Sequence, residues 1–196
     1  RQIRSALVFE AKLLPPFRPA YAEFSFDKLG VTYAGVPLGG RIDRIDVTPD
    51  GRAVVIDYKH RGSLAEFRLT DPTEKLEGEE LDPLWLPPHV QTLIYAQAVR
   101  RALGLEVVGA VYFGTRKAEV AGAVSDALAE AGMVPGIRSG FPGPKGGRLA
   151  FPELLDHVEG AVAVRLQALA RGAIAASDEA RSCRFCPAVG CETRKG

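Results

Sequence analysis

The sequence predicts an α/β fold, a mixed β-sheet flanked by helices. Strand-like runs occur at 21–27, 39–59 and 107–113, and amphipathic helical patterns occur at 89–103 and 151–170. Hydrophobic residues make up 46% of the 196 residues, which is enough to bury a sizeable core. Because strands and helices alternate along the chain, we expect the helices to pack against one sheet.

The first half of the chain is predicted to supply three strands. Tyr21–Asp27 alternates apolar and polar residues, the pattern of a half-buried strand. Gly39–Val47 and Arg52–Lys59 follow, and the Thr-Pro-Asp-Gly sequence of Thr48–Gly51 predicts a tight turn between them. Ala53–Ile56 is apolar on both faces, so the second hairpin strand is expected to lie centrally in the sheet.

The second half adds two helices and a strand. The predicted elements are, in chain order, a loop at Thr70–Pro88, a helix at His89–Leu103 ended by Gly104, a strand at Val107–Phe113, a loop at Gly132–Gly147 and a helix at Phe151–Ala170. We expect one domain over residues 1–196, with a cysteine-containing tail at 178–196. Arg1 is not a start methionine, and we expect an N-terminally truncated part of a longer protein.

Composition excludes some classes of protein but does not identify the function. The formal net charge is +1, and acidic residues concentrate at 71–90, so charge neither supports nor excludes nucleic acid as a partner. The apolar runs are shorter than the roughly 18–20 residues that a membrane helix needs, and no signal-peptide pattern opens the chain. We therefore expect a cytoplasmic protein with no membrane partner.

The candidate catalytic residues lie in the predicted hairpin. Asp57 and Lys59 alternate with Tyr58, so they point to one face of their strand, and Asp43 lies on the partner strand. Two neighbouring carboxylates repel each other unless a cation lies between them, and such oxygen ligands suit Mg²⁺ or Mn²⁺. The Tyr58 carbonyl is a further candidate ligand, and Lys59 is expected to orient the nucleophile and bind the scissile phosphate.

The motifs Gly-Arg-Ile-Asp-Arg-Ile-Asp, Val-Val-Ile-Asp-Tyr-Lys and Gln-Thr-Leu-Ile-Tyr occur in this order. Together they resemble the RecB/AddB branch of the PD-(D/E)XK nuclease superfamily. The resemblance implies that Asp43, Asp57 and Lys59 form the metal and catalytic site. It also implies that Gln91 and Tyr95, on one helix face, contact the substrate. A glutamate on the preceding strand is usual in that branch, and Glu23 matches it.

The resemblance implies a restriction-endonuclease-like core and a Mg²⁺- or Mn²⁺-dependent deoxyribonuclease. The implied role is that of an exonuclease which processes DNA ends in recombination and repair, with DNA as the substrate and a helicase subunit or domain as a partner.

The three cysteines, Cys183, Cys186 and Cys191, all lie near the end of the chain. An odd, clustered set argues against a disulfide scaffold and for a metal or cluster site. They resemble the end of AddB-type nucleases, where such cysteines and one far upstream hold a 4Fe–4S cluster. This sequence has no upstream cysteine, and it also lacks the histidine motif that the family places before the first strand. We therefore expect an incomplete cluster site here, with zinc or no metal as alternatives.

Other interpretations compete with these. The chain could be a catalytically inactive nuclease-fold module that binds DNA or supports a helicase–nuclease complex, or an iron–sulfur redox or sensing protein. Asp46 is expected to cap the turn or pair with Arg44 or Arg52. The three histidines are expected on the surface, with a phosphate contact as an alternative for the first, and four basic residues are candidate DNA-backbone contacts. These are His60, His89 and His157, and Arg61, Arg68, Arg116 and Lys117.

Overall fold

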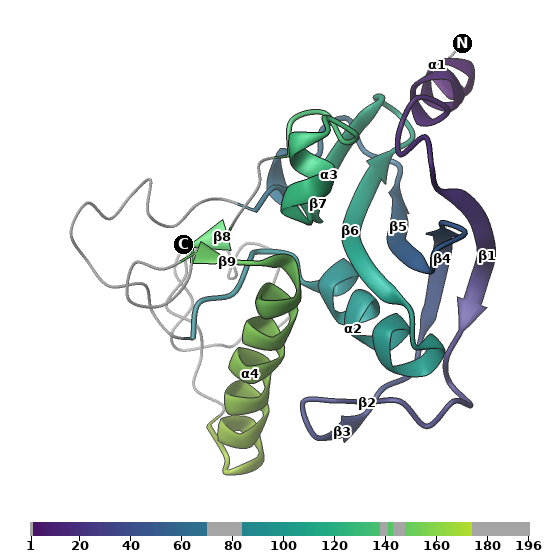
Figure 1. Cartoon of the computed structure of the whole chain (residues 1–196). Coiled ribbons are helices and arrows are strands. Elements are labelled where there is room, and N and C mark those ends of the chain that lie inside the picture. The colour runs from purple at the N-terminus through teal and green to yellow at the C-terminus, as the bar shows by residue number, and fades with distance from the viewer. Residues whose placement is uncertain (1, 70–83, 138–140, 143–147, 174–196) are drawn as a thin grey trace, which may run out of the picture.

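A five-stranded sheet with the strand order β1-β4-β5-β6-β7 lies at the centre of the protein (Figure 1). The computed structural model describes residues 2–69, 84–137, 141–142 and 148–173. The strands of this sheet are β1 (Arg18–Ser25), β4 (Arg41–Val47), β5 (Arg52–Lys59), β6 (Glu106–Gly114) and β7 (Glu119–Val124). β5 and β6 run parallel and the other neighbours run antiparallel, so the predicted mixed sheet is confirmed.

Helices cover both faces of the sheet. They are α1 (Gln2–Glu10), α2 (Gln91–Leu103), α3 (Asp126–Glu130) and α4 (Phe151–Ala170). Buried side chains of α2 and α4 share one cluster with Val55 of β5, whereas those of α1 and α3 share a second cluster with Val54. Since neighbouring side chains of a strand point to opposite faces, α2 and α4 lie on one side of β5 and α1 and α3 on the other.

The hairpin between β4 and β5 has the predicted position and turn. The backbone N–H of Gly51 donates to the carbonyl of Thr48 at 3.0 Å, and the Arg52 N–H donates to Thr48 Oγ1 at 3.0 Å. Gly51 has a φ of 86°, a conformation that glycine adopts without steric cost. The Thr-Pro-Asp-Gly sequence therefore fixes the alignment of the two strands that carry the candidate catalytic residues.

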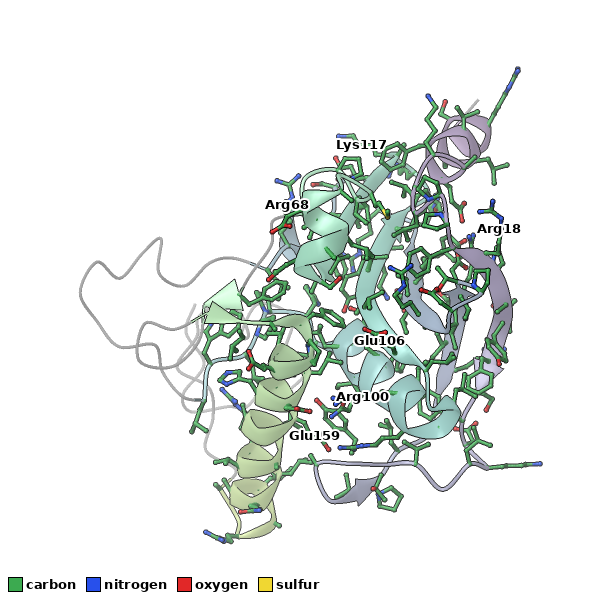
Figure 2. The ribbon with its side chains drawn as sticks, viewed as in Figure 1. Arg18, Arg68, Arg100, Glu106, Lys117 and Glu159 are labelled. Carbon is green, nitrogen blue, oxygen red and sulfur yellow. The ribbon has the colours of Figure 1, made fainter. Side chains whose placement is uncertain are left out.

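The predicted helices are found with small changes at their ends. α2 begins at Gln91 rather than His89 and ends at Leu103, where Gly104 adopts the left-handed conformation with a φ of 64°. α4 has the predicted bounds. Glu159 of α4 holds the two helices together, because its carboxylate pairs with Arg101 at 2.7 Å and accepts from Gln97 Nε2 at 2.8 Å. Figure 2 shows Glu159 on the side of α4 that faces α2.

Several elements were not predicted from the sequence: α1, α3 and β7, and the short segments β2 (Thr32–Tyr33), β3 (Val36–Pro37), η1 (Ala65–Phe67), β8 (Phe141–Pro142) and β9 (Arg148–Leu149). Most of the predicted acidic loop and the cysteine tail lie outside the described residues. The predicted loop at Gly132–Gly147 has no regular structure at 132–137, but it contributes β8. In the described part of the chain, every helix is too short or too polar to cross a membrane.

Candidate active site

Two carboxylates meet where β4 begins and β5 ends. The register pairs Arg44 with Ile56, so Asp43 and Asp57 are the next residues along and face each other across the two strands. Oδ2 of Asp43 accepts a hydrogen bond from the backbone N–H of Tyr58 at 2.8 Å, which holds this carboxylate at the end of β5. The structure thus brings together the two aspartates that the sequence analysis singled out.

Asp57 is deeply buried for a charged side chain, with only 4% of the residue exposed. Burial raises the pKa of its carboxyl, and the charge of Asp43 also raises it, whereas Lys59 lowers it. Oδ2 of Asp57 is buried, and the ammonium of Lys59 lies 2.6 Å from it. A buried carboxylate in this state is stabilised only by nearby positive charge.

Lys59 is the positive charge beside this carboxylate. Its Nζ lies 2.6 Å from Asp57 Oδ2, a close ion pair that lowers the pKa of this carboxyl against the effect of burial. Nζ also donates to Oε1 of Gln91 at 3.1 Å. It lies 5.6 Å from the ring centroid of Tyr112 and 6.0 Å from that of Phe67, within reach of cation–π attraction. Two aromatic faces and two polar contacts therefore hold the ammonium beside Asp57.

Gln91 and Tyr95 extend this chain of contacts along the first turn of α2. Nε2 of Gln91 donates to the hydroxyl of Tyr95 at 3.0 Å, as their spacing of four residues on a helix allows. The Tyr95 ring packs edge-on against Phe26, with centroids 5.7 Å apart. Gln91 is exposed and Tyr95 is half-buried, so both lie at the surface beside the buried Asp57.

These residues lie in one row: two carboxylates, a lysine and an amide–phenol pair, at one end of a mixed sheet. A family model described as the PD-(D/E)XK nuclease superfamily matches residues 1–191. The chain belongs to the PD-(D/E)XK nuclease superfamily. No curated protein sequence matches it significantly.

Members of this superfamily are generally nucleases and typically use divalent metals, so the family assignment points to nuclease activity. The predicted superfamily and the restriction-endonuclease-like fold are confirmed. The RecB/AddB branch and the iron–sulfur cysteines stay predictions, and Cys183, Cys186 and Cys191 lie outside the described residues.

Glu23 lies between the β1 residues that pair with Ile42 and Arg44, so its backbone is beside Asp43, but its side chain has another partner. Its carboxylate is exposed and pairs with Arg41 Nε at 2.8 Å. In the ranges that the structure describes, no group of three or more histidine, cysteine or acidic side chains is close enough to hold a metal ion. Tyr58, the other predicted ligand, presents its backbone N–H to Asp43, while its hydroxyl lies on the opposite face of the sheet and donates to Glu10 at 2.6 Å.

The expectation that all three histidines lie on the surface is correct only for His60, which is exposed and has Nδ1 2.9 Å from Thr115 Oγ1. The ring of His89 is half-buried and stacks on Phe67 with centroids 4.2 Å apart. His157 is half-buried too, with Nε2 3.1 Å from the carbonyl oxygen of Trp85. The two exceptions arise because chain segments far away in the sequence pack over these rings.

The predicted basic contacts are on the surface. Arg61 pairs with Glu66 at 2.7 Å, whereas Arg68, Arg116 and Lys117 are exposed. Figure 2 shows Arg68 and Lys117 in the upper part of the view, on the outside of the molecule. Exposure makes these side chains available to a phosphate backbone but does not assign them to it.

Two residues whose rings lie close to Lys59, Tyr112 and Phe67, were not predicted from the sequence as part of the site. Tyr112 lies opposite Asp57 in the parallel pair of β5 and β6, and its hydroxyl accepts from the backbone N–H of Thr92 at 3.2 Å. It thereby ties the start of α2 to the sheet. The strand pattern around Tyr112 indicated a buried face, but nothing local in the sequence specified its register against Asp57.

Proposed function

We propose that this protein is a Mg²⁺- or Mn²⁺-dependent deoxyribonuclease that hydrolyses phosphodiester bonds at DNA ends. Its proposed role is that of an exonuclease in recombination and repair, as in the RecB/AddB branch. The observation that carries the proposal is the Asp57 carboxylate, which is 4% exposed, faces Asp43 and has the ammonium of Lys59 2.6 Å from its Oδ2.

The donor set fits a hard divalent cation. Asp43 and Asp57 would hold it, with the carbonyl of Tyr58 as a third oxygen ligand, because Mg²⁺ binds through one or two carboxylates and keeps several waters. Glu23 would have to leave Arg41 before it could join them. A bound cation of this kind supplies Lewis acidity: it lowers the pKa of a coordinated water and neutralises charge on the phosphate.

Lys59 is proposed to act on the substrate directly. Its ammonium lies beside the carboxylates, where it can orient the attacking water and bind an oxygen of the scissile phosphate. Gln91 orients Lys59 through its side-chain oxygen and Tyr95 through its amide nitrogen. Because Gln91 is exposed and Tyr95 half-buried, the pair is proposed to position the DNA strand at the entrance of the site.

The choice of DNA ends as substrate rests on the set of motifs rather than on one contact. Asp43, Asp57, Lys59, Gln91 and Tyr95 keep the order and spacing of the RecB/AddB branch, and the structure joins the last four through direct contacts. A cytoplasmic location, a helicase partner and a 4Fe–4S cluster held by the tail cysteines in a longer parent protein belong to the same proposal and rest on the same resemblance.

Cleavage of end-labelled single- and double-stranded DNA tests the proposal, with Mn²⁺, Mg²⁺ or EDTA. The variants are Asp57→Asn, which removes the charge and keeps the shape, and Asp50→Asn. Asp50 is an exposed aspartate at the hairpin turn that pairs with Arg52, so it serves as a matched control. We expect metal-dependent cleavage by the wild-type protein and by the control, and none by Asp57→Asn.

The wild-type protein could bind Mn²⁺ at a saturable site that Asp57→Asn abolishes and still cleave neither DNA. This result would support the metal site and overturn the nuclease proposal. Cleavage that is unchanged in EDTA or in Asp57→Asn would overturn the assignment of the site. The ladder of labelled products distinguishes removal of end nucleotides from internal cuts.

A further inference from the structure

A second cluster of polar side chains lies on the opposite face of the same two strands. Arg44 of β4 binds both oxygens of Asp46 at 2.5 Å, donates to the Tyr58 hydroxyl at 2.9 Å and pairs with Glu10 at the end of α1. The Tyr58 hydroxyl donates to Glu10 at 2.6 Å. Asp46 is 3% exposed, so its ion pair with Arg44 is largely removed from water, and the cluster holds two carboxylates around one guanidinium. We call Glu10, Arg44, Asp46 and Tyr58 the rear cluster.

The members of the rear cluster alternate with the catalytic candidates along the chain. Arg44 directly follows Asp43, and Tyr58 lies between Asp57 and Lys59. The register pairs Arg44 with Ile56, so Arg44 and Tyr58 are diagonal neighbours on one face. Their hydrogen bond therefore ties β4 to β5 at the point where the regular pairing ends and the aspartates begin.

Tyr58 connects the two faces within one residue. Its backbone N–H donates to Asp43 Oδ2 at 2.8 Å on the front face, while its hydroxyl is held by Glu10 and Arg44 at the rear. Burial and the bond to Glu10 raise the pKa of Tyr58 to about 12, so its hydroxyl keeps its proton and remains a donor to Glu10 near neutral pH. A shift of the ring would move the amide that orients Asp43.

The position of Glu10 in α1 is electrostatically unfavourable by itself. Glu10 is the last residue of α1, and a carboxylate at the C-terminal end of a helix is electrostatically unfavourable. A small cavity lined by Glu10, Arg44 and Asp46 together with apolar side chains lies beside the contact. Figure 1 shows α1 at the end of the sheet toward which β6 runs. Phe9 packs near Phe113, and the polar contacts of Glu10 to Arg44 and Tyr58 add to this packing at the end of α1.

We propose that Tyr58, Arg44 and Glu10 are positioning residues, which hold Asp43, Asp57 and Lys59 in their active arrangement from the rear of the sheet. The kinetic part of this inference rests on the proposed nuclease function. The structural part does not, because it concerns the hydrogen bond between the amide at position 58 and Asp43.

Hydrogen exchange of the backbone amide at position 58, followed by NMR, tests the structural part. Tyr58→Phe removes the hydroxyl and Glu10→Ala removes its acceptor, whereas Glu10→Gln keeps an oxygen that accepts from both Tyr58 and Arg44. We expect the first two variants to speed exchange at position 58 by about tenfold relative to Val55, through local opening. Glu10→Gln should stay close to wild type.

Val108→Ala is the matched control, since Val108 is 6% exposed and packs on the same rear face away from the cluster. It should lower the melting temperature without a selective change at position 58. If Tyr58→Phe and Glu10→Ala speed exchange at position 58 no more than at Val55, the positioning inference is wrong.

The kinetic arm compares kcat and KM for DNA cleavage in the same variants. We expect kcat to fall about tenfold in Tyr58→Phe and Glu10→Ala with KM within about twofold of wild type, and both to be retained in Glu10→Gln. An unchanged kcat would overturn the positioning role. A wild-type protein that cleaves no DNA would instead overturn the proposed function, and the exchange data alone would then decide the inference.

Discussion

The two faces of the β4–β5 hairpin carry similar side chains in opposite states. At the rear, Asp46 is 3% exposed and both of its oxygens are bound by Arg44. At the front, Asp57 is 4% exposed, yet it faces another carboxylate, and the ammonium 2.6 Å from its Oδ2 is shared with Gln91. Both aspartates lie on the same pair of strands and are almost equally buried. They differ in the contacts that their carboxylate oxygens make.

This difference distinguishes polar groups that stabilise the fold from polar groups that can still bind a ligand. A buried charge whose hydrogen bonds are complete is held in one place and has no capacity left for a ligand. A buried carboxylate that faces a second carboxylate costs folding free energy, and such groups are frequent at functional sites. The front face therefore carries the carboxylates proposed to bind a cation, and the rear face carries the side chains proposed to position them.

The largest expected effect comes from the same substitution made on the two faces. Asp57→Asn should reduce metal-dependent cleavage by roughly 10³-fold, because a catalytic cation contributes several kcal/mol at the transition state. Its free energy of unfolding in EDTA should change little, because the substitution removes both the repulsion from Asp43 and the attraction to Lys59. Asp46→Asn should instead cost about 1–3 kcal/mol, because it weakens a bidentate contact to a charged group and leaves Arg44 with Glu10 as its charge partner.

Cleavage rates and urea unfolding of the two variants check this contrast. A large loss of stability in Asp57→Asn, or a stable Asp46→Asn protein, would show that the two faces do not differ in the way the contacts indicate.

The next effect concerns Lys59. Lys59→Met keeps most of the aliphatic stem over Tyr112 and removes the charge, and we expect cleavage to fall about 10²–10³-fold, the usual loss for one electrostatic group at a transition state. Mn²⁺ affinity, measured by calorimetry, should be kept or increased, because a positive charge leaves the carboxylates. Lys28→Met, at an exposed position, is the control. Loss of Mn²⁺ binding in Lys59→Met would contradict the assigned role.

A smaller effect is expected from Tyr95→Phe. The hydroxyl that accepts from Gln91 is lost, and one such hydrogen bond contributes about 0.5–1.5 kcal/mol, so cleavage should fall at most about tenfold. Because Gln91 also contacts Lys59, the loss should appear in kcat as well as in KM. Tyr21→Phe, on an exposed edge-strand residue, should leave both constants unchanged.

The smallest effect is a pH dependence of stability. Burial raises the pKa of Asp57 in the folded protein above its unfolded value, so the folded state keeps the proton to a higher pH than the unfolded chain does. The corresponding stability is fully present below the unfolded pKa, near about 3.9, and is lost as the pH rises through the folded pKa. In EDTA, wild type should therefore lose stability relative to Asp57→Asn as the pH increases from about 4 to 8.

Denaturant unfolding of both proteins across this range measures the difference. Added Mn²⁺ should remove the loss, since a bound cation stabilises the ionised carboxylate. A difference that grows in the opposite direction would mean that Lys59 outweighs burial at Asp57.

The elements with strong local patterns were predicted from the sequence. The hairpin and its turn, α2 and α4 follow from alternation, helical periodicity and the glycines and prolines at their ends. β7 was missed because alanine and glycine occupy its centre, between Val120 and Val124, and Gly122 shows the reason. Its φ is 124°, and a Cβ there would lie 2.3 Å from the carbonyl oxygen of Ala110. The close approach of β6 selects glycine against strand propensity.

α1 was missed for a related reason. It has no acidic residue in its first turn and no basic residue in its last, so the usual charge signals of helix ends are absent. Its last residue, Glu10, is explained only by Arg44 and Tyr58, which lie more than thirty residues away in the chain.

By itself the sequence determined which side chains share a face. Asp57 and Lys59 are two residues apart on a strand, Asp43 is on the strand that the turn pairs with it, and Gln91 and Tyr95 are four residues apart on a helix. These relations follow from backbone geometry, which is local. Only the tertiary structure decided that Gln91 meets Lys59, that Tyr112 lies beneath that lysine and that Glu10 reaches Arg44. These contacts join distant segments that pack in shared cores. The apolar pattern of a segment predicts that it is buried but not which distant segment it meets, because burial is non-directional.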